Sequence, residues 1–186
     1  MNLDIYRRWA DREQGLARQV AAVVFGAAIF VVGIPLLLVT VLPSLDARIG
    51  LPRLRDGFIN PVLALALMAP GLWLAGWSVA TQLLWGKGTP VPVVPTRRLL
   101  RQGPYSLCRN PVVLGTAMSY LGIAAWRGFL SAAGATFLLV GALLAYVKCV
   151  EEKELELRFG QHYLDYKQRT PFLLPRLLTL FRSMFK

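Results

Sequence analysis

Four long stretches without a charged residue limit what this chain can fold into. They cover residues 19–45, 57–86, 110–126 and 128–147. An α-helix needs about 20 mainly apolar residues to cross the roughly 30 Å hydrocarbon core of a bilayer, with about 17 as the lower limit. All four stretches meet that limit, and only Arg127 separates the last two. The sequence therefore predicts an all-α, polytopic membrane protein with four spans, of which the last two form a tight helical hairpin.

The distribution of basic residues predicts how these spans are oriented. With four spans, 17 of the 21 Lys and Arg residues lie on the side that holds both termini and residues 86–109. Cytoplasmic loops carry the excess of Lys and Arg, so we expect both termini in the cytoplasm. The positive charge is expected to meet anionic membrane lipids, and we expect no nucleic acid partner.

The chain is expected to be one membrane domain over residues 1–186. Residues 1–85 are predicted to hold an interfacial helix and two spans, residues 86–176 the functional core, and residues 177–186 a tail. The first 18 residues alternate apolar and charged positions, which is typical of a helix lying at the membrane surface. A signal peptide is not expected, because the first apolar stretch is too long.

The segments between and after the spans have patterns of their own. Residues 46–57 contain turn residues and are expected to be a short connection on the outer side. Residues 86–109 are rich in proline, which predicts an extended, stiff chain with a turn at Gly103-Pro104. Prolines inside the first two spans (Pro35, Pro61 and Pro70) predict kinks.

The segment that follows the last span is predicted to be one amphipathic C-terminal helix. Leu155, Phe159, Tyr163 and Tyr166 recur at helical spacing, with charged residues on the opposite face. Pro171 is expected to end this helix. It either continues directly from the last span or breaks from it and lies on the membrane.

Charged residues at the mouths of the last two spans are the candidates for chemistry. Glu151 and Glu152 follow the last span directly. A carboxylate at the membrane boundary is costly without a partner, which is either Arg109 or a cationic ligand. The alternatives without function are a solvated helix face and a snorkelling arginine before a helix capped by Asn110. Gly115, one turn into the third span, suits close packing against a helix or a ligand.

Cysteine and histidine usage points away from metal chemistry. The chain has two cysteines and one histidine, without a close cluster of them, so we expect no zinc site. Cys108 is expected to be a buried, inert thiol, because no base lies near it in the sequence. His162 is expected to be interfacial or solvated.

Two separated motifs resemble a known family. "GPYSLCRNPVVLG" is followed some forty residues later by "EEKELELRFGQHYLDYKQRTP". This pattern resembles the isoprenylcysteine carboxyl methyltransferase and phospholipid methyltransferase superfamily of integral membrane enzymes. The family pattern has G-P-Y-x-x-x-R-H-P-x-Y-x-G, a hydrophobic hairpin, and then E-E with a downstream F-G-x-x-Y-x-x-Y. The resemblance covers about residues 86–176.

The resemblance implies a methyltransferase that uses S-adenosylmethionine and binds it at the cytoplasmic ends of the last spans. It places Arg109 and Glu152 near the transferring methyl group as the catalytic pair. The residues that it assigns to the cofactor are Arg97, Arg98, Leu99, Leu100, Gly103, Tyr105, Asn110, Pro111, Val112, Val113 and Glu151.

The acceptor is expected to be a lipophilic small molecule or lipid with a carboxylate or an amine. A carboxylate needs only a cation to hold it, for which Arg109 and Lys148 are the candidates. An amine must lose a proton, for which Glu152 is the candidate base. The family His is Asn110 here, which cannot titrate, and the family Tyr is Val113, which lacks the ring and hydroxyl.

Two other functions stay open at this level. Membrane sterol reductases, which use NADPH, have a similar C-terminal signature but usually have more spans. A membrane protein that keeps the scaffold and binds a ligand or an assembly partner without turnover is the other, and Val113 favours it. The sequence indicates neither the acceptor's identity nor the oligomeric state.

Overall fold

The computed structural model describes residues 16–54, 57–86 and 98–175, and within them all regular structure is helical. The helices are α2 (Leu16–Ala27), the π-helical turn η1 (Ala28–Gly33), α3 (Ile34–Thr40), α4 (Leu42–Ile49), α5 (Ile59–Thr81), the π-helical turn η2 (Gln82–Gly86), α6 (Pro104–Leu107), α7 (Pro111–Arg127), α8 (Leu130–Tyr146), the π-helical turn η3 (Val147–Glu151), α9 (Glu152–Phe159) and α10 (Gln161–Arg169). Most of the predicted interfacial helix, Arg97 and the tail from residue 177 lie outside the described residues.

Three helical segments are long and apolar enough to cross a membrane: Val20–Ile49, Ile59–Gly86 and Leu130–Phe159. The predicted third span forms α7, whose 17 residues make it about 25 Å long, near the lower limit for crossing. A fourth span therefore stays a prediction. The all-α class is confirmed for the described part of the chain.

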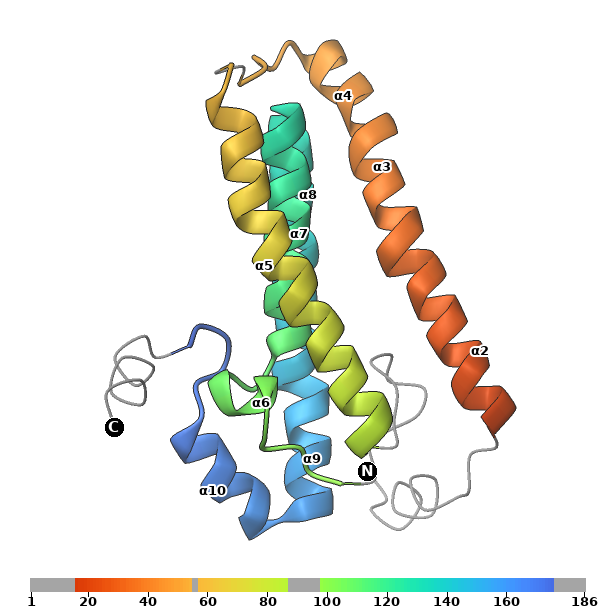
Figure 1. Cartoon of the computed structure of the whole chain (residues 1–186), viewed down its shortest axis with the longest axis vertical. Helices are drawn as coiled ribbons and strands as arrows, with labels where there is room; N and C mark the ends of the chain where they lie inside the picture. The colour runs from red at the N-terminus through yellow and green to blue at the C-terminus, as the bar shows by residue number, and fades with distance from the viewer. Residues whose placement is uncertain (1–15, 55–56, 87–97, 176–186) are drawn as a thin grey trace.

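The first candidate span is one long rod made of α2, η1, α3 and α4 (Figure 1). Its wider turn η1 ends just before Ile34-Pro35, where proline removes a backbone donor. The rod continues to Ile49 and ends at Gly50, whose φ is 69°. The connection expected at residues 46–57 is therefore shorter, because Asp46 lies inside α4 and is buried.

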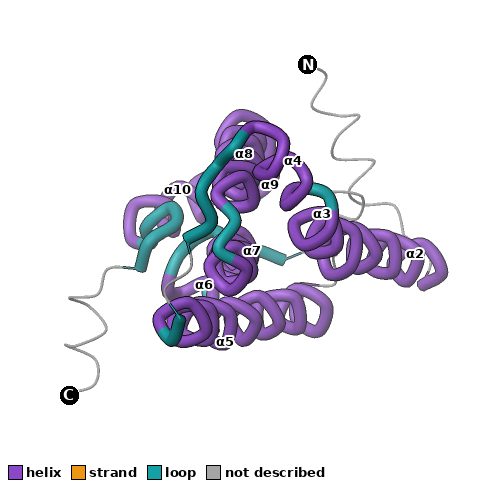
Figure 2. Tube along the Cα trace, turned by 90° about the horizontal axis from the view of Figure 1, so that it is seen from above, coloured by secondary structure: helices purple, strands orange, loops and turns teal. Residues whose placement is uncertain are grey.

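Helix α7 occupies the centre of the bundle, with α5, α8 and α3 around it (Figure 2). Gly71 of α5 and Gly115 of α7 let these two helices approach closely. A Cβ atom on Gly115 would lie 2.6 Å from both the Gly71 carbonyl oxygen and the Ala75 nitrogen. The close packing predicted at Gly115 is confirmed, and its partner is α5.

Helices α7 and α8 form the predicted tight hairpin. Helix α7 ends at Gly128, whose φ is 68°, and α8 begins two residues later. Tyr120, Phe129 and Ala132 of this hairpin are buried against Leu38 of α3. The hairpin thus closes the core around the rod and fixes where both ends of α7 lie.

The segment after the hairpin differs from its prediction. Helix α8 continues through η3 into α9, so the chain does run directly out of the last candidate span. It breaks at Gly160, which has φ 52° and ψ −130°, a conformation that residues with a Cβ rarely adopt. The prediction of one continuous amphipathic helix is therefore wrong, because α10 turns away at Gly160 (Figure 1).

Candidate active site

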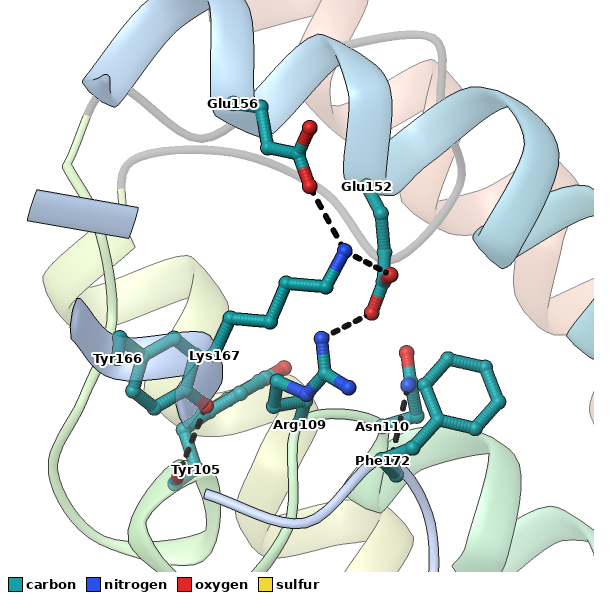
Figure 3. A network of polar contacts seen from close by, with 8 residues as sticks. All are labelled: Tyr105, Arg109, Asn110, Glu152, Glu156, Tyr166, Lys167 and Phe172. Carbon is teal, nitrogen blue, oxygen red and sulfur yellow. Dashed lines mark hydrogen bonds and ion pairs between the residues drawn. The ribbon is translucent and has the colours of Figure 1, made fainter. Parts of the chain in front are cut away.

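A buried ion pair joins the start of α7 to the start of α9. The Arg109 guanidinium binds Oε1 of Glu152, whose residue is only 4% exposed. Lys167 of α10 places its ammonium 3.0 Å from the other Glu152 oxygen and 2.7 Å from Glu156 (Figure 3). The sequence analysis named Arg109 as one possible partner of the carboxylate at this boundary, and the structure brings the two together.

This network fixes the relative positions of three helices. Both oxygens of the Glu152 carboxylate are engaged by cations, which offsets the cost of burying its charge. Removing Arg109, the buried partner, would leave an uncompensated buried charge, which is strongly destabilising, whereas the partly exposed Lys167 contributes less. Arg109, Glu152 and Lys167 therefore hold α7, α9 and α10 in one arrangement.

Residues 170–173, here called the strap, cross the entrance of α7. The Arg109 N–H donates to the Pro171 carbonyl at 2.9 Å, and the Asn110 amide donates to the Phe172 carbonyl at 2.9 Å. The Arg109 guanidinium lies 5.3 Å above the centre of the Phe172 ring. Asn110 does stand before Pro111 at the start of α7, but its side chain makes no capping hydrogen bond, because it binds the strap.

Three tyrosines pack behind the ion pair. Tyr166 donates its hydroxyl to the Tyr105 carbonyl at 2.7 Å, which joins α10 to α6. Burial and the Glu152 carboxylate raise the pKa of Tyr163 to about 12. Burial, followed by the Glu151 carboxylate, raises the pKa of Tyr105 well above its ordinary value. All three hydroxyls therefore stay neutral donors at physiological pH.

Several polar groups at this end of the bundle have no described partner. The buried atoms are Oε1 of Gln82, the hydroxyl of Tyr105 and Nε of Arg109. No hydrogen bond or ion pair joins the half-buried Glu151 carboxylate to another described residue. Buried polar atoms are normally paired, so atoms left over beside a paired network mark a place where a ligand can bind.

The remaining predicted site residues lie around this network. Gly103 has φ 60° and meets the Trp77 ring, which a Cβ would approach to 3.3 Å, and Pro104 begins the short helix α6. The expected turn at Gly103-Pro104 is thus present, although residues 104–107 are helical rather than extended. The other residues that the resemblance assigned to the cofactor differ in exposure. Arg98 is exposed, and the half-buried ones are Leu99, Leu100, Val112 and Val113.

The other candidates are more scattered. Lys148 is exposed in η3, and within the described residues no contact joins it to Arg109. His162 is exposed on α10, as expected. Cys108 is fully buried, and burial raises the pKa of its thiol. Among the described residues no three His, Cys, Asp or Glu side chains gather where they could hold a metal ion.

Sequence reasoning did not assign roles to Gln82, Lys167 or Phe172. Gln82 begins η2 at the end of a charge-free span, where an amide gives no periodic signal. The sequence predicts Lys167 only as one of the charged residues of one long helix, although its spacing puts it beside Tyr163. Its pairing with Glu152 depends on the break at Gly160, which lets α10 turn so that Lys167 meets α9.

Comparison with known proteins identifies the family. The family model described as phospholipid methyltransferase matches residues 59–162, which run from α5 into α10 and include Arg109, Glu151 and Glu152. The chain belongs to the phospholipid methyltransferase family. This result confirms the resemblance drawn from the two motifs. With the three apolar helices, it indicates an integral membrane protein with the methyltransferase scaffold.

Two curated proteins that are similar in sequence to part of this chain have names that refer to metal resistance. The cobalt-zinc-cadmium resistance protein CzcN of Cupriavidus metallidurans is 32% identical over 85 residues, which are 46% of this chain and 38% of that protein. The nickel-cobalt-cadmium resistance protein NccN of Alcaligenes xylosoxydans xylosoxydans is 35% identical over 85 residues, or 46% and 39% of the two chains. The match therefore spans less than half of either relative.

Proposed function

We propose that this protein transfers a methyl group from S-adenosylmethionine to a lipophilic acceptor at one face of the membrane. The single observation that carries the proposal is the Glu151 carboxylate, which has no described partner and lies close enough to the buried Tyr105 hydroxyl to raise its pKa. Both lie beside the Arg109–Glu152 pair. Membership of the phospholipid methyltransferase family supports the same chemistry.

The chemistry of the unpaired groups fits this cofactor. S-adenosylmethionine, when bound, supplies a methyl group on a cationic sulfonium that is its own leaving group. The Glu151 carboxylate favours a cation nearby, while the Tyr105 hydroxyl and the Gln82 amide oxygen offer hydrogen bonds. Gly103, with φ 60° and the Trp77 ring against it, makes the turn that leads to Tyr105, so we assign it to positioning Tyr105.

The ion-pair network supports a division of roles between Arg109 and Glu152. Both oxygens of Glu152 are engaged by cations, so we assign it to positioning Arg109. Arg109 keeps its Nε free of described partners and can hold an anionic acceptor there. This arrangement favours an acceptor that needs no base, such as a carboxylate, over a protonated amine. Lys148 stays a second candidate for holding the acceptor.

The location of the reaction follows from charge and hydropathy. Most of the Lys and Arg residues that the structure describes lie on the side of the bundle that holds Arg109, which favours the cytoplasmic face for this site. The same rule, applied to the sequence, favours the cytoplasm for both termini. The site lies at the ends of apolar helical segments that could cross a membrane, so a lipophilic acceptor would reach it from the bilayer. We propose membrane lipids and such an acceptor as the partners of the protein, and no nucleic acid.

Isothermal titration of the detergent-solubilised protein tests this proposal. S-adenosylmethionine should bind saturably, and Glu151→Gln should weaken its Kd by about tenfold or more, since a hydrogen bond to a charged group is lost. Asp165→Asn, which changes a carboxylate whose hydrogen bond among the described residues comes from Gln161 on the same helix, is the matched control and should bind normally.

The other outcomes separate the alternatives. Binding of NADPH instead would indicate a reductase. Binding of neither ligand would indicate a scaffold that has lost its activity, in agreement with the replacement of the family Tyr by Val113. Equal affinity of Glu151→Gln and the unchanged protein for S-adenosylmethionine would refute the role of Glu151.

A further inference from the structure

A cavity of about 470 Å³ lies at the end of the bundle remote from Arg109. It is formed where the first turn of α5, the end of α7 and the start of α8 meet the segment before α5. Its lining residues are Arg53, Gly57, Asn60, Pro61, Trp126, Arg127 and Phe129. The whole length of α7, about 25 Å, separates it from the candidate active site.

The wall of this cavity is held by specific contacts. The Leu54 N–H donates to the Gly128 carbonyl at 3.1 Å, and the Asn60 amide donates to the Leu54 carbonyl at 2.6 Å. A Cβ on Gly128 would come within 2.3 Å of the same Leu54 oxygen. Leu54 is thus tied to both α5 and the hairpin turn, which restricts the position of the adjacent Arg53.

Two arginines converge on one aromatic ring in the cavity. The guanidinium carbons of Arg53 and Arg127 lie 5.1 and 5.6 Å from the centre of the Phe129 ring. No described carboxylate pairs with either arginine. The buried Asp46 is not in the cavity lining, and one of its oxygens accepts from the Ser131 N–H of α8. Two guanidinium groups that line one cavity, with no described carboxylate paired to either, favour an anion in that cavity.

The helix that opens into the cavity adds to this preference. Asn60 and Pro61 of the lining belong to the first turn of α5. The residue at the N-cap of α5 is Phe58, which has no side-chain acceptor for the free N–H groups. Because the N-terminus of a helix carries partial positive charge, the cavity gathers two guanidinium groups and a helix terminus around one space.

We propose that this cavity binds a phosphate group. Arginine forks match phosphate oxygens in pairs, which distinguishes this ligand from a simple halide. Trp126 of the lining is 57% exposed, and tryptophan is typical of the membrane–water interface. The cavity therefore lies at the level of lipid head groups, where an anionic phospholipid presents a phosphate. This site goes beyond the methyl transfer proposed above and does not depend on it.

Native mass spectrometry of the detergent-solubilised protein with added phosphatidylglycerol tests the proposal. The double substitution Arg53→Gln and Arg127→Gln should weaken the apparent Kd of one tightly bound lipid by at least about tenfold. Arg48→Gln, which removes an exposed arginine on α4 outside the cavity, is the matched control and should bind as the unchanged protein does. Replacing both cavity arginines by lysine should retain part of the affinity, because it keeps the charge and loses the fork.

Two further arms identify the source of the phosphate. Diacylglycerol, which lacks phosphate, should show no dependence on the two arginines. Displacement of the lipid by inorganic phosphate would support a site that also takes the free ion, whereas retention would support the lipid head group as its ligand. Equal lipid affinity of the double Gln variant and the unchanged protein, with equal thermal unfolding midpoints, would overturn the proposal. So would an equal loss in Arg48→Gln.

Discussion

The contact between α5 and α7 predicts that Gly115→Ala destabilises the bundle. The added methyl group would lie 2.6 Å from the Gly71 carbonyl oxygen and from the Ala75 nitrogen, and 3.0 Å from the Ala75 Cα. All three are backbone atoms, so no side chain can rotate away to make room. The two helices must move apart, and this movement shifts Arg109 at the start of α7.

The expected magnitude follows from two opposing effects. Overpacking of a close contact costs about 1–3 kcal/mol. Replacing glycine by alanine within a helix gains up to about 1 kcal/mol in helix propensity. With the full gain in helix propensity, the net loss is up to about 2 kcal/mol, which is a factor of up to roughly 30 in the folding equilibrium. We expect a value toward this upper limit, because the contacts are to backbone atoms that cannot rotate away.

Gly76→Ala provides the matched control. Gly76 lies on α5 one residue after Ala75, yet no atom lies within 4 Å of where its Cβ would be. Reversible unfolding in detergent should show lower stability for Gly115→Ala and equal or higher stability for Gly76→Ala. If both variants were as stable as the unchanged protein, the close approach of α5 and α7 would be refuted.

Three further predictions concern the site and its surroundings. Hydrogen bonds to Glu156 and Glu152 raise the pKa of the Lys167 ammonium group above its ordinary value of 10.5. The stability that Lys167 gives to the fold is therefore present below pH 10.5 and is lost as the pH rises through the raised pKa. Lys167→Met should thus lower unfolding stability by under about 1 kcal/mol near neutral pH, with a smaller difference at strongly alkaline pH; a constant difference would contradict this ion pair. Gly160→Ala should cost about 1–3 kcal/mol in the same assay and weaken S-adenosylmethionine binding, because it strains the corner between α9 and α10; unchanged values would contradict the positive φ. A small maleimide should label the exposed Cys149 and not the buried Cys108 until the protein unfolds, as peptide mapping would show, and equal labelling would contradict the burial of Cys108.

The spans and the ion pair were accessible from the sequence because each follows from a cost that the membrane imposes. A charge-free stretch is the direct consequence of burying backbone and side chains in hydrocarbon, so the three long helices follow from composition. The cost of a carboxylate at the end of a span likewise made Arg109 one of two possible partners for Glu151 and Glu152, and Glu152 is the one that pairs with it across 43 residues.

The break at Gly160 and the strap were not accessible in the same way. Apolar residues continue at helical spacing on both sides of Gly160, and periodicity cannot show that the backbone changes direction between them. The strap is held mainly through backbone carbonyls of Pro171 and Phe172, which every residue type possesses. The cavity near Phe129 likewise depends on a turn that brings Arg53 and Arg127 together across more than seventy residues.

The strap also has a consequence for how the protein is made. Asn110 and its partner Phe172 are 62 residues apart. At about 5–20 residues per second, a ribosome needs roughly 3–12 s to proceed from one to the other. Throughout that interval the entrance of α7 lacks the segment that covers it, while α8 is still being delivered to the bilayer. Assembly of this site is therefore a late event in biogenesis, after the helices that surround it have been synthesised.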